Sequence, residues 1–172
     1  MKIPVTTVLA RILALVLVST TAVAFRPAVP GTAVSGSFTL TYVRPSVPAG
    51  MNASGASIFV STARGTNRNT GSGSYMSGAK VLNVDTAAMV QASGTHTGRA
   101  TMSEGGNTVV KRFTGTVTTT TSGGRQESTF KGTWTVIRGT GKYAGATGGG
   151  TYTGRFETGT RYTVQWKGNI SM

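Results

Sequence analysis

Residues 129–136 read Thr-Phe-Lys-Gly-Thr-Trp-Thr-Val, and this stretch decides the fold class. Every second residue is apolar or glycine, and the residues between them are threonine or lysine. Successive side chains of a β-strand point to opposite faces, so this spacing predicts a strand with one buried face and one solvated face. Threonine suits the solvated face because its branched Cβ favours an extended backbone and its hydroxyl binds water.

The same alternation recurs on both sides of this stretch. It predicts further strands around residues 37–43, 108–118, 151–156 and 161–167, each with an aromatic or aliphatic face and a face of threonine, lysine and arginine. Only residues 85–89 have the spacing of a helical turn. The sequence therefore predicts an all-β protein.

Glycines recur on the predicted buried face of several strands. A glycine inside a strand weakens it unless the backbone bends there or another group packs over it. Its repetition on consecutive strands favours a strongly coiled sheet that closes into a barrel. With turn signals at residues 104–107, 122–124 and 159, the pattern predicts a single closed antiparallel β-barrel of about eight strands, with a β-sandwich as the alternative. These glycines are Gly98, Gly115, Gly132 and Gly154.

The first 24 residues have the pattern of a signal peptide. Lys2 and Arg11 precede a short apolar run at residues 12–18, and Ala22-Val23-Ala24 has the small residues of a cleavage site. The run is shorter than the ~20 residues of a transmembrane helix. We expect cleavage near Ala24 and secretion to an extracellular or periplasmic location, with a retained N-terminal anchor as the alternative.

Cleavage leaves 148 residues, which suit one domain. Residues 25–35 carry two prolines and predict a linker, and residues 36–172 predict the barrel domain, with no transmembrane segment after processing. The chain has no cysteine, so packing and strand pairing must stabilise it without disulfides.

The mature chain is strongly basic, since fifteen lysine and arginine residues face four acidic ones once Lys2 and Arg11 are removed. Such a charge attracts polyanions in a nonspecific way. The basic residues are scattered singly, which is also typical of a solvated surface without a dedicated groove. Those on the predicted outer face include Arg99, Arg112, Lys131, Arg155, Arg161 and Lys167.

Two residues on the predicted inner face are candidate catalytic groups. His96 shares the face of Gly98 and Ala100, where it acts as a general acid or base, or is a core histidine bonded to backbone. Lys111 shares the face of Val109 and Phe113. There it has a lowered pKa or binds a ligand anion, or its amine extends from the strand end to solvent.

Aromatic side chains fill the rest of the predicted interior. They are suited to stacking on a small hydrophobic or aromatic ligand, and an ordinary aromatic core is the alternative. One histidine, no cysteine and four dispersed acids are too few for a metal centre, and no cofactor is expected. The candidate ligand-binding residues are Tyr42, Phe113, Phe130, Trp134, Tyr152, Phe156, Tyr162 and Trp166.

The segment Gly139–Gly150 is the densest glycine cluster of the chain. Tyr143 follows Lys142 where a phosphate-binding loop needs serine or threonine, so the segment is interpreted as a connection between two strands. Together with Trp134 and the Tyr152-x-Gly154 alternation, it resembles the signature of the allene oxide cyclase and dirigent-like β-barrels, in particular their small secreted bacterial relatives.

The resemblance implies an eight-stranded barrel around an apolar cavity, in a family that includes cyclases and in which homo-oligomers occur. It carries over no catalytic residue. We therefore expect a barrel that binds a small hydrophobic molecule and guides its cyclisation or isomerisation. Whether it is an enzyme stays open; an enzyme of this kind would be a cofactor-independent cyclase or isomerase. The alternative is a noncatalytic basic surface or matrix protein that adheres to anionic polymers.

Overall fold

The computed structural model describes residues 31–172. The predicted signal peptide, its cleavage site near Ala24 and most of the predicted linker lie outside the described residues. Eight strands and one short 3-10 helix make up the described part. They are β1 (Thr32–Met51), β2 (Ser57–Asn69), β3 (Lys80–Val90), β4 (Ser93–Glu104), β5 (Asn107–Ser122), β6 (Arg125–Thr140), η1 (Gly141–Tyr143), β7 (Thr147–Phe156) and β8 (Arg161–Ser171).

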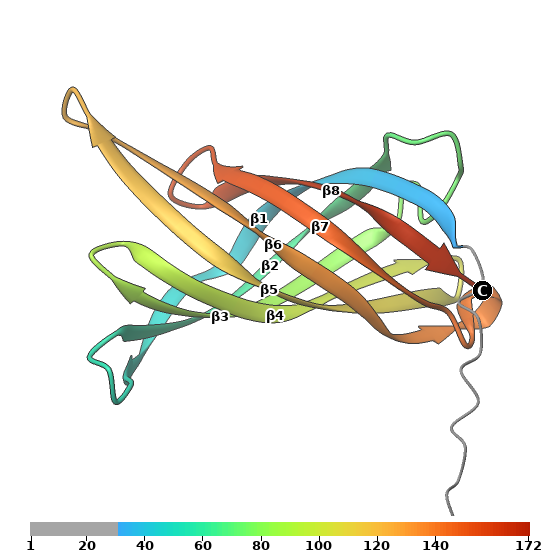
Figure 1. Cartoon of the computed structure of the whole chain (residues 1–172), viewed down its shortest axis with the longest axis horizontal. Coiled ribbons are helices and arrows are strands. Elements are labelled where there is room, and N and C mark those ends of the chain that lie inside the picture. The colour runs from blue at the N-terminus through green and yellow to red at the C-terminus, as the bar shows by residue number, and fades with distance from the viewer. Residues whose placement is uncertain (1–30) are drawn as a thin grey trace, which may run out of the picture.

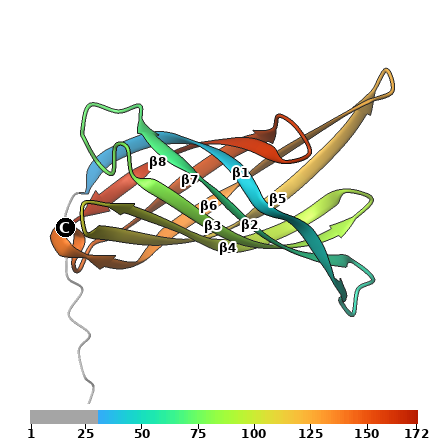
Figure 2. The same ribbon diagram turned by 180° about the vertical axis from the view of Figure 1, so that it is seen from behind.

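The strands form one closed antiparallel barrel (Figures 1 and 2). Each strand pairs with its neighbours in sequence, and β1 pairs with β8 from Thr32 opposite Ile170 to Thr41 opposite Arg161. This last pairing leaves no sheet edge open, which confirms the predicted barrel and excludes the β-sandwich. No helix among residues 31–172 is long and apolar enough to cross a bilayer.

The predicted alternation is present on the strands. On β6, Phe130 and Trp134 are buried while Lys131 and Thr133 are exposed. The glycine turns lie where the sequence places them, with positive φ at Gly105 and Gly106 between β4 and β5. The barrel interior is therefore aromatic and its outside is threonine-rich and basic.

Two details differ from the sequence-based expectation. β1 begins at Thr32, four residues before the predicted domain boundary at 36, because residues 32–35 pair with the end of β8 and Val34 is buried. Residues 85–89 belong to β3 and not to a helical turn. Their spacing looked helical because small alanines occupy both faces of the strand there.

The two ends of the barrel differ. The β1–β2 and β5–β6 hairpins project at one end, and the C-terminus lies at the other (Figures 1 and 2). Near the C-terminal end the β2–β3 connection contributes Tyr75 and Met76, and η1 contributes Tyr143. All three side chains are buried, and the Tyr75 and Tyr143 rings lie 5.4 Å apart. This end of the barrel is closed by side chains.

Candidate functional site

The barrel interior holds a cavity of about 470 Å³. It extends from Trp134, Trp166 and Lys111 to Gln91 and Ala92, which are exposed in the β3–β4 turn. A volume of this size is typical of small-molecule sites, which span ~300–1,000 Å³. The interior is therefore a pocket and not a filled core.

All ten residues that the sequence singles out line this cavity. The two candidate catalytic residues and the eight candidate ligand-binding residues come from β1 and β4–β8. Their inward orientation is confirmed, and their roles in binding or catalysis stay predictions. The ten are Tyr42, His96, Lys111, Phe113, Phe130, Trp134, Tyr152, Phe156, Tyr162 and Trp166.

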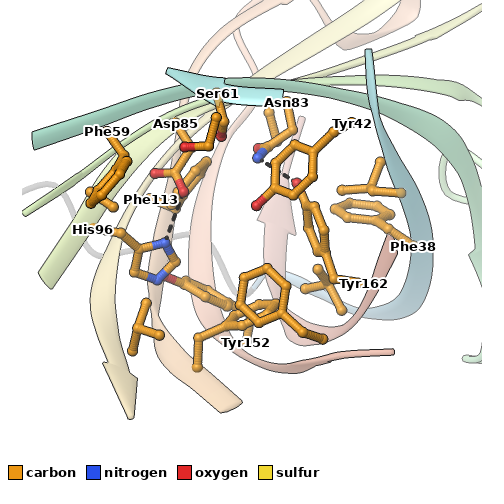
Figure 3. A pocket seen from close by; sticks show the side chains of 18 of the residues that line it. Phe38, Tyr42, Phe59, Ser61, Asn83, Asp85, His96, Phe113, Tyr152 and Tyr162 are labelled. Atoms are coloured by element: carbon orange, nitrogen blue, oxygen red, sulfur yellow. Dashed lines mark hydrogen bonds and ion pairs between the residues drawn. The ribbon is translucent and has the colours of Figure 1, made fainter. Parts of the chain in front are cut away.

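His96 is at the centre of a polar group that we call the His96 cluster, made of Asp85, His96 and Tyr152 (Figure 3). His96 Nδ1 lies 3.4 Å from Asp85 Oδ2, and His96 Nε2 lies 2.9 Å from the Tyr152 hydroxyl. A carboxylate only accepts hydrogen bonds, so Nδ1 carries the proton in the neutral ring and Nε2 accepts from Tyr152. His96 is bonded to side chains and not to backbone, contrary to the alternative considered for it.

The three members of the His96 cluster come from β3, β4 and β7. Burial raises the pKa of Tyr152, and the negative charge of Asp85 raises it further, so the phenol stays protonated at neutral pH. Asp85 Oδ1 is buried and has no hydrogen-bond partner. The cluster therefore offers a protonated phenol backed by an imidazole that can take or return its proton.

Two glycines make room for the Tyr152 hydroxyl. A Cβ on Gly115 or Gly132 would overlap both that hydroxyl and the backbone of the neighbouring strand. The two glycines face each other in the β5–β6 pairing, so together they form a gap in the wall of the barrel. The inward glycines predicted from the sequence thus serve a specific contact as well as the curvature of the sheet.

A second hydrogen-bonded pair comes from β3 and β8 (Figure 3). The Asn83 side-chain amide donates to the Tyr162 hydroxyl at 3.0 Å, which leaves the proton of that hydroxyl free for another acceptor. Burial raises the pKa of Tyr162 despite the Asn83 bond. Burial and, to a smaller extent, Asp85 also raise the pKa of the neighbouring Tyr42 to about 12. Both phenols are therefore hydrogen-bond donors at neutral pH.

Lys111 is deep in the cavity, with 2% of its surface exposed. Its Nζ lies 3.7 Å from the Trp166 ring centroid, 3.9 Å from that of Trp134 and 5.4 Å from that of Tyr75. We call these four residues the lysine cage. Burial lowers the pKa of Lys111 to about 7, and Nζ has no hydrogen-bond partner. The alternative in which this amine extends to solvent is wrong.

Hydrogen bonds fix the two indole rings of the lysine cage. Trp166 Nε1 donates to Asn67 Oδ1 at 3.1 Å, and Trp134 Nε1 donates to the Thr151 carbonyl at 3.2 Å. Asn67 is fully buried, and its amide donates in turn to the Met76 carbonyl. Both indole N–H groups thus donate to the protein, whereas Lys111 Nζ and the Tyr75 hydroxyl have no hydrogen-bond partner.

Sequence reasoning missed Asp85, Asn83 and Tyr75. Asp85 and Asn83 share the inner face of β3 with Val81, and this alternation is a signal that was available. The helical spacing of residues 85–89 obscured it. Tyr75 comes from the β2–β3 connection, where no periodicity indicates which side chains turn inward.

The fold and the site define a closed antiparallel β-barrel with an apolar cavity and a few polar groups aimed into it. No protein-family model matches the chain, and no curated protein has a significantly similar sequence. Among residues 31–172, no three histidine, cysteine, aspartate or glutamate side chains are grouped closely enough to hold a metal ion. The described polar side chains of the cavity can form hydrogen bonds with an organic ligand and exchange protons with it.

Proposed function

We propose that this protein binds a small hydrophobic or aromatic molecule inside its barrel and guides the cyclisation or isomerisation of that molecule. The observation that carries the proposal is the cavity of about 470 Å³, with the His96 cluster on its wall. An apolar pocket with a few convergent polar groups is the usual form of a small-molecule site.

Binding would come from the aromatic lining. Phe113, Phe130 and Tyr152 surround His96 with ring centroids 5.5–5.8 Å from its own, and they present flat apolar surfaces to a ligand. Each Å² of apolar surface removed from water contributes roughly 25 cal/mol. A rigid wall also holds a flexible ligand in one conformation, which favours one ring closure over others.

Proton transfer would come from Tyr152 and His96. The Tyr152 oxygen takes a proton from one carbon of the ligand while its own phenol proton passes to His96 Nε2 across 2.9 Å. The imidazolium then returns that proton to the phenol oxygen, which delivers the first proton to another carbon of the ligand. Asp85 holds the imidazole orientation and stabilises its cation. Tyr162, on the other hydrogen-bonded pair, supplies a hydrogen-bond donor for a polar group of the ligand.

The proposal also covers the location of the protein and its family. The signal-peptide pattern of residues 1–24 supports export, and the closed eight-stranded topology with its cavity supports kinship with the allene oxide cyclase and dirigent-like barrels. Homo-oligomers are part of the same expectation. The lining of the cavity comes from the eight strands and the β3–β4 turn of one chain.

Intrinsic tryptophan fluorescence tests binding, because Trp134 and Trp166 line the cavity. We expect a saturable change with apolar ligands such as decanol or naphthalene derivatives. Ala87 lines the cavity while its neighbour Ala88 lies on the other face of β3. Ala87→Phe should weaken binding at least roughly tenfold by occupying the cavity, whereas Ala88→Phe should not change it.

A further variant of the same protein, Tyr152→Phe, tests proton transfer. Tyr152→Phe should retain the ligands and lose conversion of a bound β,γ-unsaturated ketone to its conjugated isomer, followed by absorbance. Unchanged fluorescence with every lipophilic ligand, or equal binding by the Ala87→Phe and Ala88→Phe variants, would contradict the proposed function.

A second candidate function is adhesion to anionic polymers through the outer face. The six basic residues predicted to point outward are all exposed, and Arg161 is the one that pairs with an acid, Glu157, at 3.1 Å. We expect retention on heparin at low salt that falls steeply as salt rises. Exchanging Arg99 and Arg112, which are opposite each other on β4 and β5, for glutamine should lower the eluting salt concentration. Retention that does not depend on salt would exclude this function.

A further inference from the structure

The lysine cage is a feature that the proposed proton transfer does not use. Lys111 and the His96 cluster occupy different levels of the cavity. His96 is opposite Gly115 on β5, four residues from Lys111, which corresponds to about 13 Å along the strand. Phe113 lies between them on the inner face of β5. An elongated ligand would reach both levels at once.

We propose that Lys111 is a covalent attachment site that forms an imine with the aldehyde group of an elongated apolar ligand. This inference rests on the ligand cavity of the proposed function and names the class of ligand. In the reaction the Nζ lone pair attacks the carbonyl carbon and a carbinolamine forms. The carbonyl oxygen then leaves as water with two hydrogens from the amine, and a C=N bond replaces the C=O bond.

Geometry favours an amine that reacts. Nζ is buried, lines the cavity and has no hydrogen-bond partner. None of the ion pairs among the described residues includes Lys111. An unpaired buried amine is driven toward its neutral, nucleophilic form, and the lowered pKa agrees with this. The indole faces of Trp134 and Trp166 attract the ammonium form, but more weakly than the carboxylate partner that usually accompanies a buried lysine would.

The surroundings of Nζ favour a ligand with an aldehyde carbonyl over a ligand with a carboxylate. A carboxylate needs several hydrogen-bond donors when it is buried. At this level both indole N–H groups already donate to Asn67 and to the Thr151 carbonyl. The Tyr75 hydroxyl and Lys111 Nζ are the unpartnered donors, and of these two residues Lys111 is the one that lines the cavity. An aldehyde brings one uncharged oxygen and loses it as water. The flat faces of Trp134 and Trp166 would then pack against the ligand carbons next to the imine.

Reductive trapping tests the inference. The purified protein is incubated at pH 7 with decanal and sodium cyanoborohydride, and intact mass and peptide mapping follow the decyl adducts. We expect one adduct, at Lys111. Exposed lysines should react at least roughly tenfold more slowly, because at pH 7 an ordinary lysine with a pKa near 10.4 holds very little free amine. Lys111→Met should abolish the fast adduct, and Lys131→Met, on the outer face, should keep it.

Further arms separate this inference from the proposed function. Tryptophan fluorescence should show that decanol binds. Bound decanol should lower the rate at which decanal labels Lys111 and leave the labelling rate of exposed lysines unchanged. Decanol binding without a preferred adduct at Lys111 would overturn the imine and leave the ligand cavity standing. If decanol does not bind and no adduct forms preferentially at Lys111, both the imine and the proposed ligand-binding function would be contradicted. Tighter binding of decanoate than of decanol, with no adduct from decanal, would make Lys111 an anion-binding group instead.

Discussion

Replacing Gly132 with alanine should lower the free energy of unfolding by about 3 kcal/mol, because the added Cβ overpacks a closed wall. That Cβ would overlap the Thr114 carbonyl on β5 as well as the Tyr152 hydroxyl. This backbone oxygen belongs to a closed sheet, so it cannot move away from the added Cβ without weakening the strand pairing. For a domain of this size, the melting temperature should fall by roughly 10 °C, which thermal unfolding followed by circular dichroism measures.

Gly159→Ala is the matched control for this change. Gly159 lies in the β7–β8 turn, nothing lies within 4 Å of its Cβ position, and its φ is not in the left-handed range. Its substitution should stay within about 0.5 kcal/mol of the wild type. Adding Tyr152→Phe to Gly132→Ala removes the overlap with the hydroxyl and leaves those with the backbone, so the double variant should be more stable than the sum of the single effects predicts. Equal melting temperatures for the two alanine variants would contradict the packing described for this wall.

Replacing Lys111 with methionine should stabilise the protein at neutral and acidic pH. Folding lowers the pKa of this lysine from 10.5 to about 7, so between these values the unfolded chain binds more protons than the folded one. The stability of the wild type should therefore rise relative to Lys111→Met as pH increases from 7 to 10, by roughly 4 kcal/mol. Urea unfolding of both proteins across this range measures the difference.

The titratable neighbour of Lys111 is Tyr75, since the other two members of the lysine cage are tryptophans. Burial raises the pKa of Tyr75, so its phenol stays neutral over the same range and does not disturb the comparison. Lys131→Met, at an exposed position on β6, is the matched control for the loss of one lysine. A difference between the wild type and Lys111→Met that does not change with pH would mean that folding leaves the protonation of Lys111 unchanged.

The inner face of the barrel could be predicted from the sequence because alternation is a property of one strand. Each β-strand places every second side chain on the same face, whatever its partners are. This local rule was enough to orient Phe130 and Trp134 inward and to orient Lys111 and His96 with them. It failed at residues 85–89, where alanines on both faces conceal the alternation. Asp85 was therefore not recognised as an inward carboxylate.

The alternation within one strand could not predict which inward residues contact one another. His96 and Tyr152 are 56 residues apart, Asn83 and Tyr162 are 79 apart, and Asn67 and Trp166 are 99 apart. Their contacts depend on strand register, on the stagger of the closed sheet and on the pairing of β1 with β8. None of these can be read from a single strand.

The sequence by itself determined an all-β chain, a basic threonine-rich exterior and an aromatic inner face. The reason is that side-chain periodicity and residue type act within each strand. Only the tertiary structure decided that this inner face surrounds a cavity, that Asp85 and Tyr152 flank His96, and that Lys111 is enclosed by tryptophans. The cavity and the contacts across it depend on the distance between opposite walls of the closed barrel. The lysine cage also depends on Tyr75, a loop residue whose position no strand pattern predicts.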